Sequence, residues 1–360
     1  MHHPSKHPSV TAVPPPPEPL LRYRSQVEAE LRSAITGSHL QDSQDPELYR
    51  ILRYHLGWVD EQDQPTDVPG GKAFRPGLCI LSCEAAGGTP DVAIPAAAAV
   101  ELAHNFSLIH DDIQDHDQER RHRATVWTLW GKAKALNAGN ALSVVADRTL
   151  MRLAERGVPA DRLLQASNLL AQRSLQMIQG QYLDISFEDR LDVSDREYKE
   201  MIAYKTGALI SCAMELGALA GPAPGTLHSL MGEAGWYLGY LFQIRDDILG
   251  IWGDESATGK SQGSDIRRKK KTYPIIHALQ NATGATRATL HGIFQKESLS
   301  DDDVSRAMDV LEELDARKSA ETLASRMSEQ AFHILRKVPM HPSIAADFSG
   351  ILDFLLLRES

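Results

Sequence analysis

The stretch PAAAAVELAHNFSLIHDDIQD, residues 95–115, decides how this chain folds. Its alanine-rich first half favours a helix, and Pro95 is placed where proline is tolerated, in a first helical turn. Leu102, Phe106 and Ile109 recur at the spacing of one helix face, which indicates that this face is buried. The stretch therefore predicts a long core helix that ends in a cluster of carboxylates.

Three carboxylates end this stretch: Asp111, Asp112 and Asp115. Because residues i and i+4 share a helix face, Asp111 and Asp115 point the same way, with Asp112 beside them. Carboxylates on an inner face repel one another and are costly to desolvate, unless a divalent cation binds them. Mg²⁺ prefers oxygen ligands and often binds through carboxylates and substrate phosphates. The alternative for one such cluster is a solvated helix face.

A second acidic cluster, RDDILG at residues 245–250, weakens that alternative. Asp246 follows Asp111 by 135 residues, and Asp247 stands next to it. Apolar residues at helical spacing precede this cluster too, at Leu238 and Leu241. Two acidic clusters that face each other across a helical cavity would hold a diphosphate through bound metal.

The composition bounds the class of protein. A net charge of −10 argues against nucleic acid as the main partner, although a local basic pocket remains compatible with it. Three cysteines without metal-ligand spacing indicate reduced core thiols in the cytoplasm. No uninterrupted apolar run reaches the ~18 residues of a membrane span, and we see no hydrophobic signal core. We therefore expect a cytoplasmic protein with no stable membrane span.

The chain divides into a short leader and one long helical region. Residues 1–19 are rich in proline and lack apolar periodicity, which predicts a disordered leader; a docking tail for a protein partner is the alternative. Residues 20–360 read as one all-α domain, a single large helical bundle with a central substrate cavity. Polar, basic residues 253–272 predict a loop over that cavity. Apolar residues recur at helical spacing over residues 133–153, 162–184, 194–220 and 227–249.

Cations stand beside glycines or acidic clusters at several points of the chain. Each alone is ordinarily a solvated surface charge, but a diphosphate needs such partners besides metal. Their recurrence beside the acidic clusters favours an anion site. These cations are Lys72, Arg75, Arg120, Arg121, Lys205, Lys260 and the run at residues 267–271.

In order and spacing, these motifs resemble those of the trans-isoprenyl diphosphate synthases, also called polyprenyl synthetases. The resemblance covers the chain from about Leu21 onward and is highly specific. The matching motifs are GGKAFRP at residues 70–76, HNFSLIHDDIQD at 104–115 followed by Arg120 and Arg121, GQYLD at 180–184, KTG at 205–207, FQIRDDIL at 242–249 and GK at 259–260.

The resemblance implies the isoprenoid synthase type of bundle and a head-to-tail prenyl transfer. An allylic diphosphate ionises, isopentenyl diphosphate attacks the carbocation, and loss of a proton leaves a chain longer by five carbons. Mg²⁺ assists the departure of diphosphate as a Lewis acid. The implied ligands are Asp111, Asp112 and Asp115 for two metals and Asp246, with Asp247 beside it, for a third, so that about three ions bind with the diphosphate.

The resemblance also implies roles for residues outside the acidic clusters. Members of the family usually form homodimers, so the resemblance leads us to expect a homodimer here. The implied roles are binding of the allylic diphosphate by Arg120, Lys205, Gln243, Lys260 and Lys270, binding of isopentenyl diphosphate by Lys72, Arg75, His104 and Arg121, and stabilisation of the carbocation by Thr206 and Gln243.

Departures from the family pattern leave the implied core ligands in place. Gly250 stands where a third aspartate of the second cluster is usual, and Lys269 stands where glycine is usual. Phe106 and Ser107 lie five and four residues before Asp111, so Phe106 falls about one turn deeper in the predicted tunnel. A ring there is typical of C15 to C20 products, and the absence of an insertion within the first motif favours C20. The alternative is that Phe106 is core.

Two other functions remain open from sequence alone. A terpene cyclase on the same fold would not need the cations assigned to isopentenyl diphosphate, and this chain lacks the NxxxSxxxE pattern of many cyclases. A non-catalytic partner subunit of another synthase would not need its acidic clusters. The sequence therefore favours the synthase.

Overall fold

A computed structural model describes residues 16–36, 46–66, 73–253 and 262–357. The elements in chain order are α1 (Glu18–Leu21), α2 (Arg24–Thr36), α3 (Pro46–His55), α4 (Phe74–Ala85), α5 (Pro90–Gln114), β1 (Glu119–Arg120), β2 (Arg123–Ala124), α6 (Val126–Trp130), α7 (Lys132–Met151), η1 (Arg152–Arg156), α8 (Ala160–Phe187), α9 (Asp195–Ile202), η2 (Ala203–Gly207), α10 (Ala208–Ala220), α11 (Gly225–Trp252), α13 (Ser264–Arg267), α14 (Tyr273–Asn281), α15 (Gly284–Phe294), α16 (Asp301–Glu313), α17 (Ala316–Leu335) and α18 (Pro342–Leu357).

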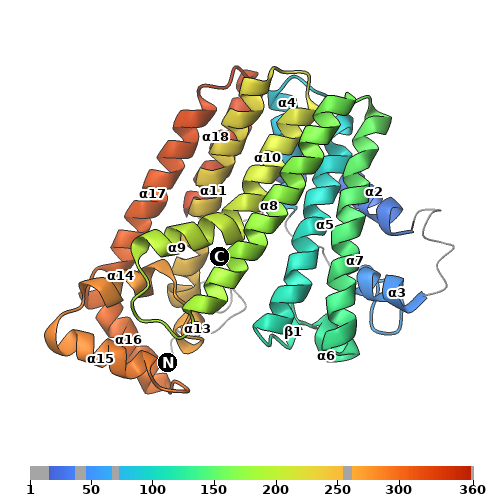
Figure 1. The fold of residues 1–360 in the computed structure, drawn as a ribbon. Coiled ribbons are helices and arrows are strands. Elements are labelled where there is room, and N and C mark those ends of the chain that lie inside the picture. Colours follow the sequence, from blue (N-terminus) through green and yellow to red (C-terminus); the bar gives the residue numbers. More distant parts are fainter. Residues whose placement is uncertain (1–15, 37–45, 67–72, 254–261, 358–360) are drawn as a thin grey trace, which may run out of the picture.

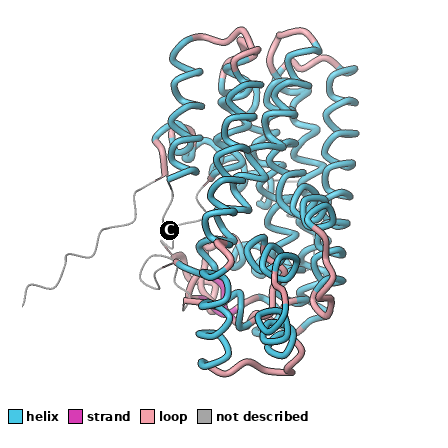
Figure 2. Tube along the Cα trace, turned by 90° about the vertical axis from the view of Figure 1, so that its left-hand side faces the viewer, coloured by secondary structure: helices cyan, strands magenta, loops and turns pink. Residues whose placement is uncertain are grey.

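The long helices run side by side in one bundle, with α13 to α16 forming a smaller group at one end (Figure 1). In the part of the chain that the structure describes, the named strands are β1 and β2, a two-residue antiparallel ladder at the same end (Figure 2). This confirms the predicted all-α bundle. Residues 1–15 of the predicted leader lie outside the described residues, and α1 begins at Glu18, two residues before the predicted boundary.

Helix α5 is the core helix of the bundle and packs against α4, α7 and α10. Its consecutive alanines at residues 96–99 are fully buried, because small side chains let neighbouring helices approach closely. The prediction that Pro95 lies in the first turn is wrong: the helix begins at Pro90, and Pro95 lies inside it. An earlier proline takes the first-turn position, where no intrahelical N–H bond is lost.

Helix α5 is also apolar and long enough to cross a membrane by length and composition. Its most apolar window has a mean hydropathy of 1.4, but 72% of that window is buried inside the protein. Burial of this kind is typical of a core helix. The three cysteines are free and buried, as the sequence predicts for core thiols.

The single helix predicted over residues 194–220 is interrupted by a π-helical turn, η2, between α9 and α10. Its start is confirmed within one residue, because Ser194 and Glu197 form a capping box. Glycines let two helices approach η2 closely. A Cβ on Gly180 of α8 would lie 2.0 Å from the Lys205 amide nitrogen, and one on Gly239 of α11 would lie 2.4 Å from the Gly207 Cα. Single π-turns inside helices often mark functional sites.

Candidate active site

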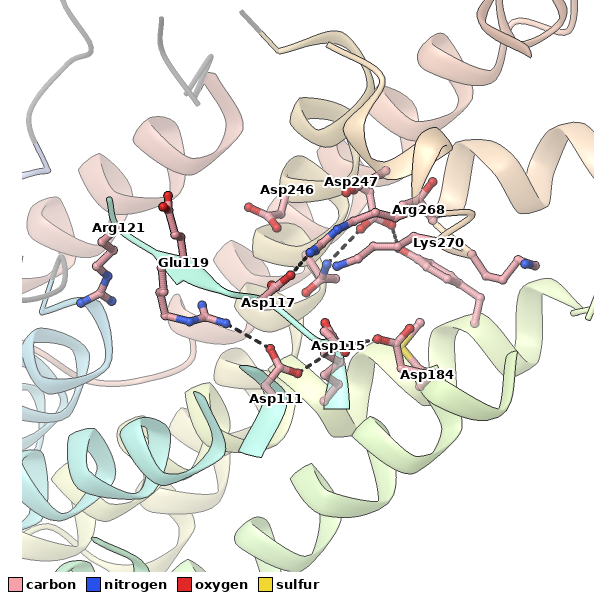
Figure 3. Close-up of a pocket in the computed structure, with 18 of the residues that line it drawn as sticks. Asp111, Asp115, Asp117, Glu119, Arg121, Asp184, Asp246, Asp247, Arg268 and Lys270 are labelled. Atoms are coloured by element: carbon pink, nitrogen blue, oxygen red, sulfur yellow. Dashed lines mark hydrogen bonds and ion pairs between the residues drawn. The ribbon is translucent and has the colours of Figure 1, made fainter. Parts of the chain in front are cut away.

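A cavity of about 650 Å³ lies where α5, α8, η2 and α11 meet the segment that follows α13. Figure 3 shows Asp111 and Asp115 on one side, Asp246 and Asp247 on another, and Arg268 and Lys270 reaching between them. The two acidic clusters therefore face one cavity. The predicted residues that line it are Asp111, Asp115, Arg120, Arg121, Lys205, Gln243, Asp246, Asp247 and Lys270.

The first acidic wall stands at the C-terminal end of α5. Asp111 and Asp115 line the cavity, whereas Asp112 is only 2% exposed and accepts a 2.6 Å hydrogen bond from Arg120 Nε. Burial raises the pKa of Asp112 to about 6, although Arg120 acts in the opposite direction. Burial and the charge of Asp111 raise the pKa of Asp115. This wall is thus a desolvated, crowded set of carboxylates that a cation would relieve.

The second acidic wall, on α11, holds two carboxylates in different environments. Asp247 is buried and accepts hydrogen bonds from the Tyr198 hydroxyl (2.6 Å), Gln243 Nε2 (2.9 Å) and the Tyr273 amide (2.9 Å). Burial raises its pKa to about 7 despite these donors. Asp246 is more exposed and lines the same cavity. The structure therefore engages Asp247 with protein donors and leaves Asp246 as the more exposed of the two carboxylates.

Gln243 is held at both ends of its carboxamide. Thr206 Oγ1 donates a 2.6 Å hydrogen bond to Gln243 Oε1, while Gln243 Nε2 donates to Asp247. These two bonds fix which end of the amide carries oxygen. Thr206 itself is buried and does not line the cavity; it reaches the site through Gln243.

Lys205 is carried into the cavity by the π-turn η2. Its ammonium lies 2.5 Å from Asp184 Oδ2 and 3.7 Å from Asp111 Oδ1, so it joins α8 to the first acidic wall. Burial alone would lower the pKa of Lys205, but the two carboxylates outweigh burial and hold the pKa above its usual value. Burial would raise the pKa of Asp184, but the charge and hydrogen bond of Lys205 outweigh it and hold that pKa below its usual value. Both groups are charged at neutral pH.

The segment after α13 forms the basic side of the cavity. We call residues 267–272 the basic strap. Arg268 pairs with Asp117, which follows the first acidic cluster, and Lys270 also lines the cavity. Lys271 is 3% exposed, and its ammonium donates to the carbonyls of Glu188 (2.6 Å) and Lys269 (3.0 Å). Burial, and then the Lys269 charge, lower the pKa of Lys271 to about 8. The described part of the predicted loop therefore lies at the cavity.

Arg121 also lines two smaller cavities behind the first acidic wall. One contains His55, whose pKa burial lowers to about 3; the other contains Glu101. Burial lowers the pKa of Arg75 to about 10 while Glu101 opposes the shift, and burial with Arg75 keeps His104 neutral. The charges of Arg75 and Arg121 both lower the pKa of His104, so the three residues lie in one region beside the main cavity.

Besides Asp112, Thr206, Arg75 and His104, which do not line the main cavity, four predicted site residues remain. Lys72 and Lys260 lie outside the described residues. Phe106 is 5% exposed and packs in the core with its ring 5.8 Å from that of His110, and Ser107 donates to the His104 carbonyl. Neither lines the described cavity.

Sequence reasoning assigned no role to several residues that line this cavity. Asp184 had a signal, because it ends the GQYLD motif. Lys271 also had a signal, as the last cation of the run at residues 267–271. Tyr198 and Asp265 had no local signal, since they reach the site only through the packing of α9 and α13. Asp117 and Glu119 follow the first acidic cluster closely and belong to the loop and strand beside it.

The donor set fits Mg²⁺ held together with a diphosphate. Within the described ranges, no three His, Cys, Asp or Glu side chains converge closely enough to form a metal cage. Mg²⁺ commonly uses one or two carboxylates, with waters and substrate phosphates completing its octahedron. Carboxylates on facing walls, with cations of the basic strap between them, match that type of site. Asp111, Asp115 and Asp246 are the groups placed to contribute.

Comparisons with known proteins agree with this geometry. The polyprenyl synthetase family model matches residues 62–311. The (2E,6E)-farnesyl diphosphate synthase of Mycobacterium tuberculosis is 36% identical over 324 residues, covering 89% of each chain. A geranylgeranyl diphosphate synthase of Saccharolobus solfataricus is 39% identical, covering 75% of this chain and 81% of that protein. The polyprenyl synthetase structure from Streptomyces coelicolor A3(2) superposes with a TM-score of 0.85 at 37% identity, covering 94% of this chain and 98% of that one. This chain belongs to the polyprenyl synthetase family.

Proposed function

We propose that this protein is a short-chain trans-prenyl diphosphate synthase that joins isopentenyl diphosphate head-to-tail to an allylic diphosphate. The observation that carries the proposal is the pair of acidic walls, led by Asp111 and Asp246, that face one cavity together with Lys205 and Lys270. A site built for an anion alone would not gather carboxylates on two walls. The relatives named farnesyl and geranylgeranyl diphosphate synthases support the same reaction.

The residues of the cavity suit the ionisation of an allylic diphosphate. When bound, Mg²⁺ supplies Lewis-acid stabilisation of the departing diphosphate. Lys205, Arg120 and Lys270 place fixed positive charge where negative charge develops on the leaving group. The fixed orientation of the Gln243 carboxamide directs its dipoles beside the reacting carbon, with Thr206 holding that orientation. We propose about three Mg²⁺ ions in the loaded site.

Isopentenyl diphosphate fits the region behind the first acidic wall. Arg75, His104 and Arg121 lie there together, and Lys72, the fourth residue proposed for isopentenyl diphosphate, lies outside the described residues, as does Lys260, which is proposed for the allylic diphosphate. Two guanidinium groups in partly desolvated surroundings are strong partners for phosphate oxygens. Holding both substrates in line lowers the entropic part of the barrier. This second substrate is what separates the synthase from a cyclase.

The test is product analysis with purified protein. The protein is incubated with isopentenyl diphosphate, Mg²⁺ and, separately, the C5, C10 and C15 allylic diphosphates, with matched reactions in EDTA. We expect linear prenyl diphosphates by mass spectrometry and none in EDTA. A hydrocarbon released from an allylic diphosphate alone would instead identify a cyclase. Activity seen only after mixing with another synthase would identify a partner subunit.

We propose products of C15 to C20, with C20 favoured. The relatives include both farnesyl and geranylgeranyl diphosphate synthases, so they support this range. We expect Phe106, about one turn before Asp111 on α5, to limit the length of the growing chain, although its ring packs in the core and does not line the described cavity. Phe106→Ala should lengthen the main product, and Ser107→Ala tests the other position proposed to affect chain length. An unchanged product distribution in Phe106→Ala would assign that ring to the core alone.

We also propose that two copies associate through α7 and α8. Large apolar side chains along these two helices are exposed and recur at helical spacing, which is uncommon on a monomer surface. Light scattering should give the mass of a dimer, and Ile178→Glu with Tyr182→Glu should give a monomer. A wild-type mass of about 40 kDa would contradict the dimer. The exposed residues are Leu136, Val144, Leu164, Leu175, Ile178, Tyr182 and Ile185.

Two further proposals concern the cellular setting. We propose a cytoplasmic location, supported by the burial of α5 and the free cysteines; fractionation of cells that express the tagged protein tests it.

We propose that the proline-rich residues 1–19 dock a protein partner, because polyproline II segments bind aromatic grooves at low entropic cost. Deletion of these residues should leave product formation unchanged and abolish co-purification of that partner.

A further inference from the structure

The second acidic wall lacks a carboxylate of its own at one position. Gly250 lies four residues after Asp246 on α11, so both positions share the face of the helix that borders the cavity. The structure fills this gap from elsewhere in the chain. A Cβ placed on Gly250 would lie 2.0 Å from Asp265 Oδ2 and 2.5 Å from its Cγ. The carboxylate of Asp265 thus occupies the space beside the bare Gly250 backbone.

Docking of α13 onto the end of α11 brings Asp265 there. The Gly263 amide donates to the Ile251 carbonyl (3.0 Å), and Ser264 Oγ donates to the Gly250 carbonyl (3.3 Å). Gly263 makes this turn with φ of 73°, in the left-handed region that glycine adopts readily. A side chain at position 250 would prevent this approach of α13. Gly250 is therefore what lets Asp265 reach the wall.

Asp265 belongs to the interior of the site and not to a solvated face. It is 8% exposed and lines the main cavity with Asp246 and Asp247. Burial is the main cause of the raised pKa of Asp247, and the charge of Asp265 raises it further, against the hydrogen bonds that lower it. The two carboxyl groups therefore lie close to each other. Its backbone carbonyl accepts from the Lys270 amide (3.0 Å). Asp265 thus joins the second acidic wall to the start of the basic strap.

We propose that Asp265 is the third carboxylate of the second acidic wall and helps to bind the Mg²⁺–diphosphate complex in place of a side chain at Gly250. This inference rests on the proposed function, because it assigns a residue to that same site. A carboxylate carried by α13 has a consequence that one on α11 would not have. Because α13 leads directly into the basic strap, the segment that supplies Asp265 also supplies Lys270, so that this carboxylate and this cation are held at the wall together.

The test measures binding directly, by titration calorimetry of Mg²⁺ with inorganic diphosphate into the substrate-free protein. Asp265→Asn should weaken binding by about 10- to 100-fold, the usual range for groups that support a metal site. Gly250→Ala keeps every charge but inserts the Cβ next to Asp265, and should weaken binding as well. The double variant Gly250→Asp with Asp265→Ala moves the carboxylate onto α11. It should bind Mg²⁺ and diphosphate at least tenfold more tightly than Asp265→Ala alone.

Each outcome is decisive for one of the two proposals. No binding of Mg²⁺ and diphosphate by the wild-type protein overturns the proposed function. Wild-type binding with equal affinity in Asp265→Asn overturns the role of Asp265. If Asp265→Asn fails to fold by circular dichroism, Gly250→Ala decides, because an unchanged affinity in that folded variant overturns the proposal. Recovery in the double variant supports it, since both members of that comparison lack Asp265.

Discussion

Replacement of Gly180 by alanine tests whether the close approach of α8 to the π-turn positions Lys205 in the proposed active site. The new Cβ would lie 2.0 Å from the Lys205 amide nitrogen and 2.6 Å from its Cα, where ordinary contact begins at 3.4 Å. Both neighbouring atoms belong to the backbone, so no flexible side chain can move aside. Relief of the clash requires α8 and η2 to separate by roughly 1 Å or more, since overpacked cores shift their backbone.

This displacement has two measurable consequences. Overpacking should lower the free energy of unfolding by about 1–3 kcal/mol. Lys205 would move relative to Asp184 and Asp111, which lie 2.5 and 3.7 Å from its ammonium, and a shift of about 1 Å in a catalytic group can cost about 100-fold in rate. We therefore expect kcat/KM for the allylic diphosphate to fall by about two orders of magnitude.

The assays are steady-state kinetics and guanidinium unfolding. Gly292→Ala in α15 is the matched control, because no atom lies within 4 Å of its Cβ position. A helical glycine with open space gains up to about 1 kcal/mol on replacement by alanine, so this variant should be slightly more stable and fully active. Wild-type kcat/KM and an unchanged unfolding midpoint in Gly180→Ala would refute the reasoning.

Three further perturbations separate roles within the site. Lys271→Met should raise the KM for the allylic diphosphate severalfold, because the basic strap loses its hydrogen bond to the Glu188 carbonyl at the end of α8. Lys269→Met should leave this KM unchanged, because the Lys269 ammonium bonds the Lys296 carbonyl away from the cavity. Equal KM values in the two variants would exclude an anchoring role for Lys271. Asp246→Asn should abolish turnover with little change in the free energy of unfolding. Asp247→Asn should abolish turnover and also lower the free energy of unfolding, because three donors bond that carboxylate. Equal denaturant midpoints in the two variants would argue against this difference in roles. Burial lowers the pKa of His55 from 6.5 to about 3, so the unfolded state binds more protons and stability falls as the pH drops from 6.5 toward 3. His55→Gln should remove at most about 2 kcal/mol of that loss at pH 5, as measured by denaturant unfolding at pH 7 and pH 5. An unaltered difference in the free energy of unfolding between the two pH values would contradict this prediction.

The spacing of residues along the chain was enough to predict several helices and part of the candidate site. Apolar spacing placed α7, α8 and α11 within three residues of their observed ends, and the i, i+4 relation of Asp111 and Asp115 placed both on one face that lines the cavity. The clearest error within a helix, the position of Pro95, arose because Pro90 offered an equally good first turn. Local propensity cannot choose between two prolines; the packing of the whole of α5 does.

The sequence by itself determined the all-α class, the two acidic clusters and the cations around them, because each is encoded by residue type and helical period over a few turns. Only the tertiary structure decided which side chains meet. The pairing of Lys205 with Asp184, the enclosure of Asp247 by Tyr198 and Tyr273, and the entry of Asp265 beside Gly250 each join distant segments. Such contacts depend on how closely helices approach, which is set by small residues on facing surfaces and by the packing of the whole bundle.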